Sequence, residues 1–257
     1  MSVTLIKGVN IGEVPPTPTE NIYDTSTVAE ACTQLRKYAY KYGIPTGYKQ
    51  EQDGRLINSV LPNPTTEFQQ ISSSSKVNLE LHTETAFHPY KPSHVLLLCL
   101  RGDHQAPTTF AIVDEIVESL DNETVTLLKQ PLYITAIDDS FRTHGEPNKS
   151  IVMPILKEDV HGLSICFDEF FMRGETFEAQ EALDKLKIAI TEKTREIVLE
   201  AGDLFVLDNR KTIHGRKPFS PRYDGTDRWV LRCLVVDRMP PDTQFVYEDH
   251  MMITTEM

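Results

Sequence analysis

Two histidines and a glutamate are the residues of this sequence best suited to hold a metal ion. His82 and Glu84 stand two apart at the end of an alternating apolar run over residues 76–81. Because side chains alternate along a strand, the two project to the same face. His214 lies far downstream and has to be brought to them by the fold. Two imidazoles and one carboxylate cover one face of an octahedral metal and leave the other positions open, an arrangement associated with Fe(II) and oxygen chemistry.

A histidine and a glutamate two apart are by themselves typical of a solvated turn, and two arginines add to the evidence here. Arg228 lies fourteen residues beyond His214 and Arg232 eighteen, both within the strand-like segment 228–236. Being four apart, they share one face of that strand, opposite the face that carries Trp229 and Leu231. Buried guanidinium groups are costly unless each meets an anion. A dicarboxylate and an amino-acid carboxylate would supply two such anions.

Four motifs in order carry a family resemblance: Leu81–Glu84, Leu100–His104, the run from Asp208-Asn209 to Arg216, and the Arg228/Arg232 pair. Together they resemble the clavaminate synthase-like branch of the Fe(II)/2-oxoglutarate oxygenases, which is related to TauD. That branch includes hydroxylases of free arginine, asparagine and lysine. The resemblance covers about residues 76–237, well over half of the chain.

The resemblance implies a complete iron site with its cosubstrates. His82, Glu84 and His214 would bind Fe(II), and the open positions would take 2-oxoglutarate and O2. Arg228 would hold the distal carboxylate of 2-oxoglutarate, and Arg232 the carboxylate of the substrate. Glu84 would also border the substrate. Since Glu84 fills the third iron position, no vacancy remains for chloride, which favours hydroxylation over halogenation.

Two further residues follow from the resemblance. A threonine after the His-x-Glu motif would contact 2-oxoglutarate; Thr108 and Thr109 compete for this role, and Thr109 is preferred because Thr109-Phe110-Ala111 fits the family pattern better. Asp168 lies in a segment that resembles the stretch where an acidic residue meets the polar end of the substrate. A carboxylate there suits a lysine or arginine side chain. The alternative for Asp168 is a strand-end aspartate that caps the following turn.

The sequence therefore predicts an enzyme that hydroxylates a free L-amino acid, with a basic one favoured. Two other functions stay open. The same site could desaturate or cyclise a small secondary metabolite, because the ligand set does not fix the fate of the substrate radical. A non-catalytic jelly-roll module could bind a metal or a small ligand, although such a module has no evident need for the pair Arg228 and Arg232.

Many short strand-like runs and a few helices predict an α+β, mainly β fold: a double-stranded β-helix (jelly-roll, cupin-like) core flanked by helices. Residues 1–257 read as one oxygenase domain. The clearest helix begins after Thr176 as N-cap and continues over residues 177–187. Residues 44–75 are rich in Pro, Gly, Asn and Ser, which predicts a lid or a flexible loop. Asp208 and Asn209 are expected to form a turn before His214.

Charge and hydropathy limit the partners. A formal net charge of −12 argues against nucleic-acid and anionic-membrane binding, which need basic surfaces. The longest apolar run, residues 95–100, is too short to span a bilayer, and no signal segment opens the chain. These features predict a cytoplasmic protein whose partner is a small amino-acid substrate, and they leave a homo-oligomer open.

Overall fold

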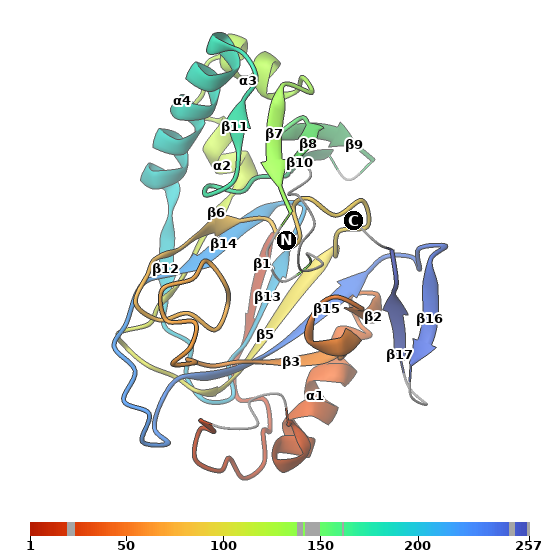
Figure 1. The fold of residues 1–257 in the computed structure, drawn as a ribbon, viewed down its shortest axis with the longest axis vertical. Helices are drawn as coiled ribbons and strands as arrows, with labels where there is room; N and C mark the ends of the chain where they lie inside the picture. Colours follow the sequence, from red (N-terminus) through yellow and green to blue (C-terminus); the bar gives the residue numbers. More distant parts are fainter. Residues whose placement is uncertain (20–23, 138–140, 142–149, 161, 247–249, 256–257) are drawn as a thin grey trace.

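Two β-sheets face each other at the centre of the protein, as the computed structural model shows (Figure 1). The structure describes residues 1–19, 24–137, 141, 150–160, 162–246 and 250–255. The larger sheet has eight strands; in spatial order they are β1 (Val3–Ile6), β13 (Leu204–Asp208), β5 (His94–Arg101), β15 (Trp229–Val236), β2 (Ile44–Tyr48), β17 (His250–Ile253) and β16 (Thr243–Val246), and β3 (Ile57–Val60) also pairs with β15.

The smaller sheet carries the residues with candidate chemistry. Its four strands are β12 (Arg195–Ile197), β6 (Thr108–Ile112), β14 (Thr212–Arg216) and β4 (Leu79–His82), in that order and all antiparallel. Two minor sheets extend beyond it: β11 (Arg173–Gly174), β7 (Tyr133–Ala136) and β8 (Ser150–Met153) form one, and β9 (Leu156–Asp159) with β10 (Gly162–Ile165) the other.

The inner faces of the two main sheets form an apolar core. Phe110 of the smaller sheet packs edge-on against Phe205 of the larger one, with ring centroids 5.2 Å apart. Leu97 and Val230 add apolar side chains from the larger sheet to the same cluster. Alternation along each strand fixes which residues point inward, as expected for a sheet buried on one face. The predicted jelly-roll core is confirmed.

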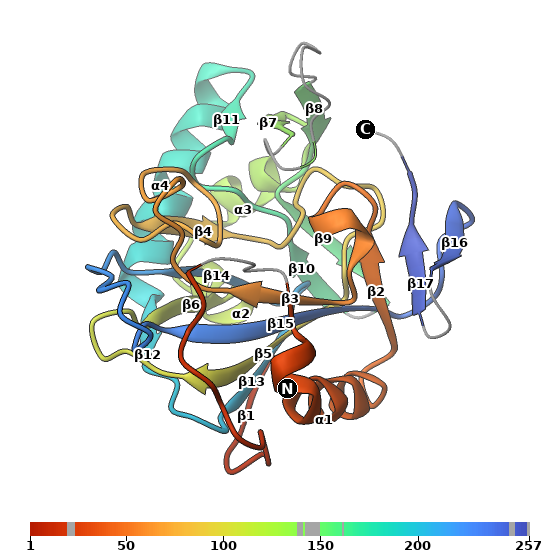
Figure 2. The same cartoon turned by 60° about the horizontal axis from the view of Figure 1, so that its bottom comes forward.

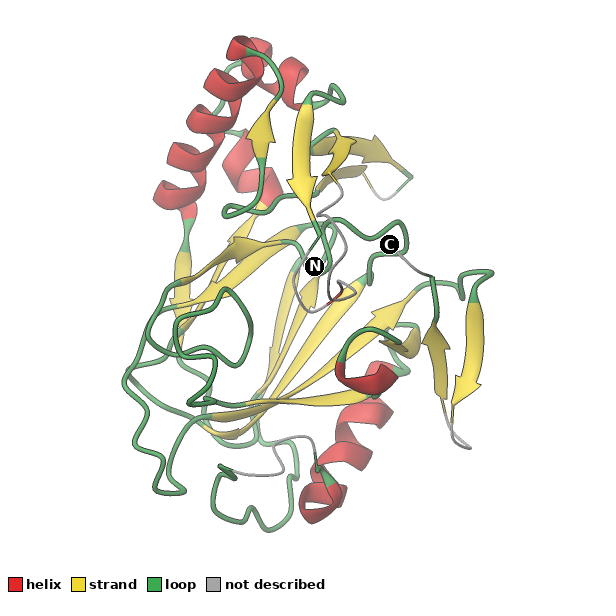
Figure 3. Cartoon of the chain, viewed as in Figure 1, coloured by secondary structure: helices red, strands yellow, loops and turns green. Residues whose placement is uncertain are grey.

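Helices cover the outer faces of both sheets, which Figures 2 and 3 show from two directions. A 3-10 turn (Ser26–Val28) leads into α1 (Ala29–Ala39), which packs on the outer face of the larger sheet. α2 (Val113–Val117), α3 (Asn122–Leu128) and α4 (Phe177–Lys193) cover the smaller sheet. As predicted, Thr176 caps α4, its Oγ1 accepting from the backbone N–H of Ala179 at 3.2 Å. None of the helices in the described part of the chain has the length and apolar character of a membrane span.

The prediction of a lid or flexible loop over residues 44–75 is wrong for its first half. β2 pairs with β15 and β17, and β3 pairs with β15, so both strands belong to the larger sheet. Gly47, which resembles a turn signal in the sequence, lies inside β2. A Cβ atom there would come within 2.3 Å of the carbonyl oxygen of Gly54, in the second 3-10 turn (Gln52–Gly54). The glycine is therefore required by close backbone packing and does not mark a loop.

Candidate active site

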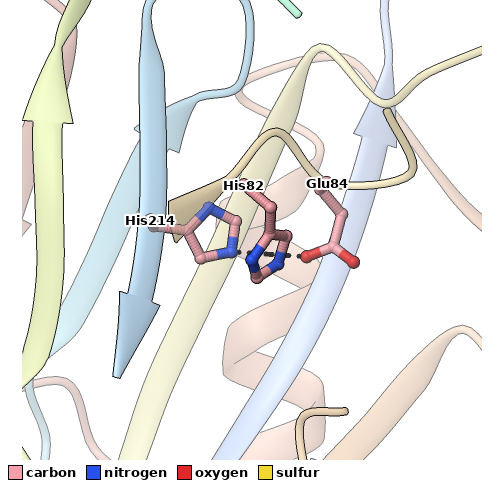
Figure 4. A group of neighbouring side chains, drawn as sticks. All are labelled: His82, Glu84 and His214. Atoms are coloured by element: carbon pink, nitrogen blue, oxygen red, sulfur yellow. Dashed lines mark ion pairs between the residues drawn. The ribbon is translucent and has the colours of Figure 1, made fainter. Parts of the chain in front are cut away.

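The three predicted metal ligands meet on the inner face of the smaller sheet. His82 is the last residue of β4 and pairs directly with His214 of β14 across the antiparallel ladder. Their imidazole centroids lie 4.7 Å apart. Glu84, two residues past the strand end, brings Oε2 to 3.4 Å from Nε2 of His214. One donor atom from each residue lies within 4.8 Å of the others, and Figure 4 shows the three side chains turned toward one another.

These side chains fit a mononuclear Fe(II) site. Donors bound facially to one metal at about 2.0–2.2 Å lie ~3 Å apart. The separation of 3.4 Å between Glu84 and His214 is close to this value, and the whole set lies within 4.8 Å. Nδ1–H of His82 donates to the carbonyl oxygen of Glu80 at 2.8 Å, which leaves the Nε2 lone pair free for a metal. The Nδ1 atom of His214 is buried and has no hydrogen-bond partner among the described residues.

The electrostatics keep Glu84 and His214 in their metal-binding protonation states. Burial lowers the pKa of His214, although the neighbouring Glu84 opposes the shift, and the imidazole is therefore neutral near pH 7. Burial disfavours ionisation of Glu84, but the Arg232 guanidinium and the two imidazoles outweigh it. The pKa of Glu84 therefore lies well below its usual value. Neutral imidazoles and an ionised carboxylate are the forms that bind metals.

A cavity of about 470 Å³ surrounds the triad. Arg228 and Arg232 both line it, four residues apart on one face of β15 and its N-terminal flank. At a strand rise of about 3.3 Å per residue, the two stand roughly 13 Å apart along the chain. Trp229 and Leu231 belong to the core on the opposite face, as the alternation predicts. Arg228 and Arg232 therefore mark two separate ends of the cavity.

The Arg228 end has no counter-charge of its own. Arg228 is 7% exposed, and its Nη2 donates to Oγ1 of Thr108 at 3.3 Å. Arg216 also lines this cavity and is buried. In the described ranges of the chain, no carboxylate forms an ion pair with either arginine. Burial lowers the pKa of both guanidinium groups, that of Arg216 to about 9. The guanidinium of Arg216 donates to the carbonyl oxygen of Ser74 at 2.6 Å, whereas Arg228 is a buried cation without a carboxylate partner among the described residues and therefore indicates an anion-binding site.

The geometry favours Thr108 over Thr109 as the threonine of this end. Thr108 lines the cavity together with Arg228. Thr109 is the next residue along β6 and pairs with Gly215 and with Glu196 of β12. Alternation along β6 turns its side chain to the outer face, which carries Ala111. The preference for Thr109 rested on a local family pattern that does not reveal which way a strand residue points.

The Arg232 end is, in contrast, rich in carboxylates. Nη1 of Arg232 donates to Oε1 of Glu84 at 3.0 Å, and Nη2 forms an ion pair with Glu51. Burial raises the pKa of Glu51, and Arg232 counters only part of this shift. Glu51 was not foreseen from the sequence. It stands in the polar run Gln50-Glu51-Gln52 just after β2, where no spacing or motif marks it.

Asp168 borders the cavity beside the triad. It forms an isolated antiparallel bridge with His82, on the side opposite to β14. Its Oδ1 accepts from the backbone N–H groups of Phe170 at 3.0 Å and Phe171 at 2.8 Å. The turn-capping role is therefore present. Because Asp168 also lines the cavity, a role in substrate recognition is compatible with it.

Comparisons with known proteins identify the family of this chain. The family model described as "Taurine catabolism dioxygenase TauD, TfdA family" matches residues 5–234. An L-lysine 3-hydroxylase from Catenulispora acidiphila is 33% identical over 241 residues, which cover 90% of this chain and 66% of that enzyme. An L-asparagine oxygenase from Streptomyces coelicolor is 34% identical over 225 residues, with 87% and 67% covered. The chain thus spans about two thirds of the length of these relatives.

Solved structures resemble the whole chain. A crystal structure of asparagine oxygenase matches with a TM-score of 0.86 at 30% identity, covering 100% of this chain and 80% of that one. The non-heme iron oxygenase OrfP in complex with Fe, succinate and (3S)-hydroxy-L-Arg matches with a TM-score of 0.84 at 29% identity, with 93% and 77% covered. The jelly roll and the His-Glu-His triad are consistent with an iron- and 2-oxoglutarate-dependent oxygenase. The chain belongs to the TauD/TfdA family of dioxygenases, which confirms the predicted resemblance.

Proposed function

We propose that this chain hydroxylates a free L-amino acid with a cationic side chain, lysine or arginine, and converts 2-oxoglutarate to succinate and CO2 in the same turnover. Family membership supports the reaction class and makes the binding-only module an inferior alternative. Relatives named as L-lysine 3-hydroxylase and as L-ornithine/L-arginine 3-hydroxylase support the basic substrate. A relative named as L-asparagine oxygenase supports a neutral one. The charge of the cavity favours the basic substrate.

The ionised side chains that line the cavity leave one negative charge. Four carboxylates (Glu51, Glu80, Glu84 and Asp168) face three guanidinium groups (Arg216, Arg228 and Arg232). Fe(II) and the dianion of 2-oxoglutarate cancel each other. A zwitterionic amino acid with one further positive charge would then make the loaded cavity neutral, whereas asparagine would leave it negative. Since uncompensated charge is costly in a buried site, this balance favours a cationic substrate.

The residues of the Arg228 end would bind and orient 2-oxoglutarate. Arg228 would hold the distal carboxylate by a bidentate pair, with Thr108 as an additional hydroxyl donor. Arg216 would add positive charge beside it. His82, Glu84 and His214 would hold the iron, which with 2-oxoglutarate and O2 supplies the oxidation of an unactivated C–H bond. The role of the protein is to orient the substrate and exclude water.

The Arg232 end would bind the zwitterionic head of the substrate. A free amino acid carries a carboxylate for Arg232 and an ammonium group for Glu51, so binding would replace one internal ion pair by two with the ligand. The head group therefore matches both members of the existing pair. Asp168 would take the cationic side-chain terminus through Oδ2, since its Oδ1 caps the following turn. Contacts at both ends of the substrate would fix which C–H bond faces the metal.

A screen of the proteinogenic amino acids for stimulated 2-oxoglutarate turnover tests the proposal. Lysine or arginine should stimulate iron-dependent succinate formation most, and the product should gain one oxygen atom by mass spectrometry. Loss of two hydrogen atoms would instead identify desaturation. Stimulation by asparagine alone would refute the hypothesis of a cationic substrate, but it would still support the proposed reaction class. The absence of iron-dependent succinate formation with every amino acid would contradict the proposed reaction itself.

A further inference from the structure

The backbone of Glu84 lies beyond the end of its strand. β4 ends at His82, and the next N–H, that of Thr83, donates to the carbonyl oxygen of Phe167 at 2.7 Å. Thr85 then adopts a left-handed conformation with φ of 50°. A β-branched residue avoids this region, and such a conformation persists only where surrounding contacts hold it. Glu84 therefore needs hydrogen-bond partners from outside the ladder.

The side-chain amide of Asn209 supplies these partners. Its Oδ1 accepts from the N–H of Glu84 at 2.8 Å, and its Nδ2 donates to the carbonyl oxygen of Glu84 at 3.2 Å. Nδ2 also donates to the carbonyl oxygen of Pro92 at 2.9 Å. Asn209 is 1% exposed. The amide thus binds both backbone polar groups of Glu84, as a neighbouring peptide group would in a sheet.

The position of Asn209 links the two parts of the triad. It lies in the turn between β13 and β14, five residues before His214. Asp208 forms the expected turn, its Oδ1 accepting from the N–H of Arg210 at 3.0 Å, but the Asn209 side chain leaves the turn and reaches Glu84. One connection therefore places His214 through its strand and Glu84 through a side-chain amide.

We propose that Asn209 is a positioning residue for the metal site: it fixes the backbone of Glu84 so that the carboxylate already faces His82 and His214 before a metal arrives. This inference rests on the proposed ligand set. Groups that orient metal ligands affect metal affinity by about 10- to 100-fold when they are removed. Arg232 holds the carboxylate end of Glu84, so Asn209 and Arg232 constrain this ligand from its two ends.

Asn209→Ala and Asn209→Asp test the proposal by Co(II) binding, measured by calorimetry in the absence of oxygen. Both variants should bind Co(II) about 10- to 100-fold more weakly than the unchanged protein. Asn209→Asp keeps an acceptor for the Glu84 N–H but loses the donor for two carbonyl groups. Asp121→Ala is the matched control, because it removes the N-cap of α3, where Oδ1 accepts from the N–H of Thr124 at 2.7 Å, and leaves the site untouched. It should lower the Tm without weakening Co(II) binding.

Several outcomes would overturn the inference. One is an unchanged Co(II) affinity in Asn209 variants that fold. Another is that Asp121→Ala loses as much Co(II) affinity as the Asn209 variants when its Tm falls by a similar amount. Hydrogen exchange on the unchanged protein is independent of variant folding: the Glu84 amide should be protected without metal, and free exchange there would contradict a preformed site. His214→Ala separates the two proposals. If it binds Co(II) as tightly as the unchanged protein, the ligand set is wrong.

Discussion

Replacing Glu51 by glutamine removes one negative charge and keeps the size of the side chain. Glu51 forms an ion pair with Arg232, with side-chain exposures of 14% and 6%, so solvent screens the pair little. In our proposal the same carboxylate receives the substrate ammonium group. A charge-assisted hydrogen bond of this kind contributes about 1.5–3 kcal/mol, which corresponds to roughly 10- to 150-fold in affinity. The KM for the amino acid should rise by this factor.

Steady-state kinetics with the amino acid and 2-oxoglutarate varied separately gives the assay. The KM for 2-oxoglutarate should stay unchanged, because that ligand binds at the Arg228 end. The pH dependence adds a second readout. Burial raises the pKa of Glu51 above that of an ordinary glutamate, and ammonium binding needs the ionised form. The amino-acid KM should therefore rise as the pH falls through this raised pKa, and Glu51→Gln should remove this limb of the profile.

Glu80→Gln is the matched control, since it removes a carboxylate from the lining of the same cavity without touching Arg232. The KM of Glu80→Gln for the amino acid should change much less than that of Glu51→Gln. An N-acetylated amino acid, which has no ammonium group, should be equally poor with the unchanged protein and with Glu51→Gln. If Glu51→Gln left the amino-acid KM unaltered, or raised the KM for 2-oxoglutarate instead, the assignment of Glu51 would be refuted.

Three further predictions concern the remaining parts of the cavity. Arg228→Ala should raise the KM for 2-oxoglutarate and Arg232→Ala that for the amino acid, each roughly 10- to 150-fold; steady-state kinetics checks this, and a rise in only the amino-acid KM for both would contradict it. Asp168→Asn should lower kcat/KM for the basic amino acid far more than it lowers uncoupled 2-oxoglutarate decay, because the cosubstrate does not contact this residue; equal losses would argue for the turn-capping role alone. Residues 70–73 line the cavity, and the segment 61–78 that contains them should become more resistant to trypsin at Lys76 when Co(II), 2-oxoglutarate and substrate are bound. An unchanged cleavage rate would count against a lid there.

Four of the site residues that were predicted from the sequence lie on regular strands or directly beside them. His82 is the last residue of β4, and His214 lies within β14. Arg228 directly precedes β15, and Arg232 lies inside it. On a strand, spacing in the sequence translates directly into a shared face. The helix that follows Thr176 was predicted because its local sequence pattern is equally regular. α4 has an N-cap and an apolar period, and its first residue in the structure is the predicted one. Where the local pattern and the tertiary environment agree, sequence alone is informative.

The segment from β2 to β3 was not predicted, because its composition opposes its structure. Pro45 and Gly47 are residues that normally interrupt strands, yet both lie in β2. Pro45 pairs with Val235 of β15, and Gly47 admits a backbone carbonyl at a distance that no side chain allows. Such requirements arise from elements distant in sequence. The same limit applies to Thr108 and Thr109, where only the register of β6 decides which side chain enters the cavity.

Glu51 and Asn209 share one property that explains why the sequence did not reveal their contacts. Each acts on a residue more than a hundred positions away, Glu51 on Arg232 and Asn209 on Glu84. Neither lies in a regular element, so no period predicts where its side chain points. Both contacts are local in space and involve charged or backbone groups that burial makes costly to leave unpaired. The structure therefore adds two residues that contact Glu84 and Arg232, the proposed iron ligand and the proposed substrate-binding arginine.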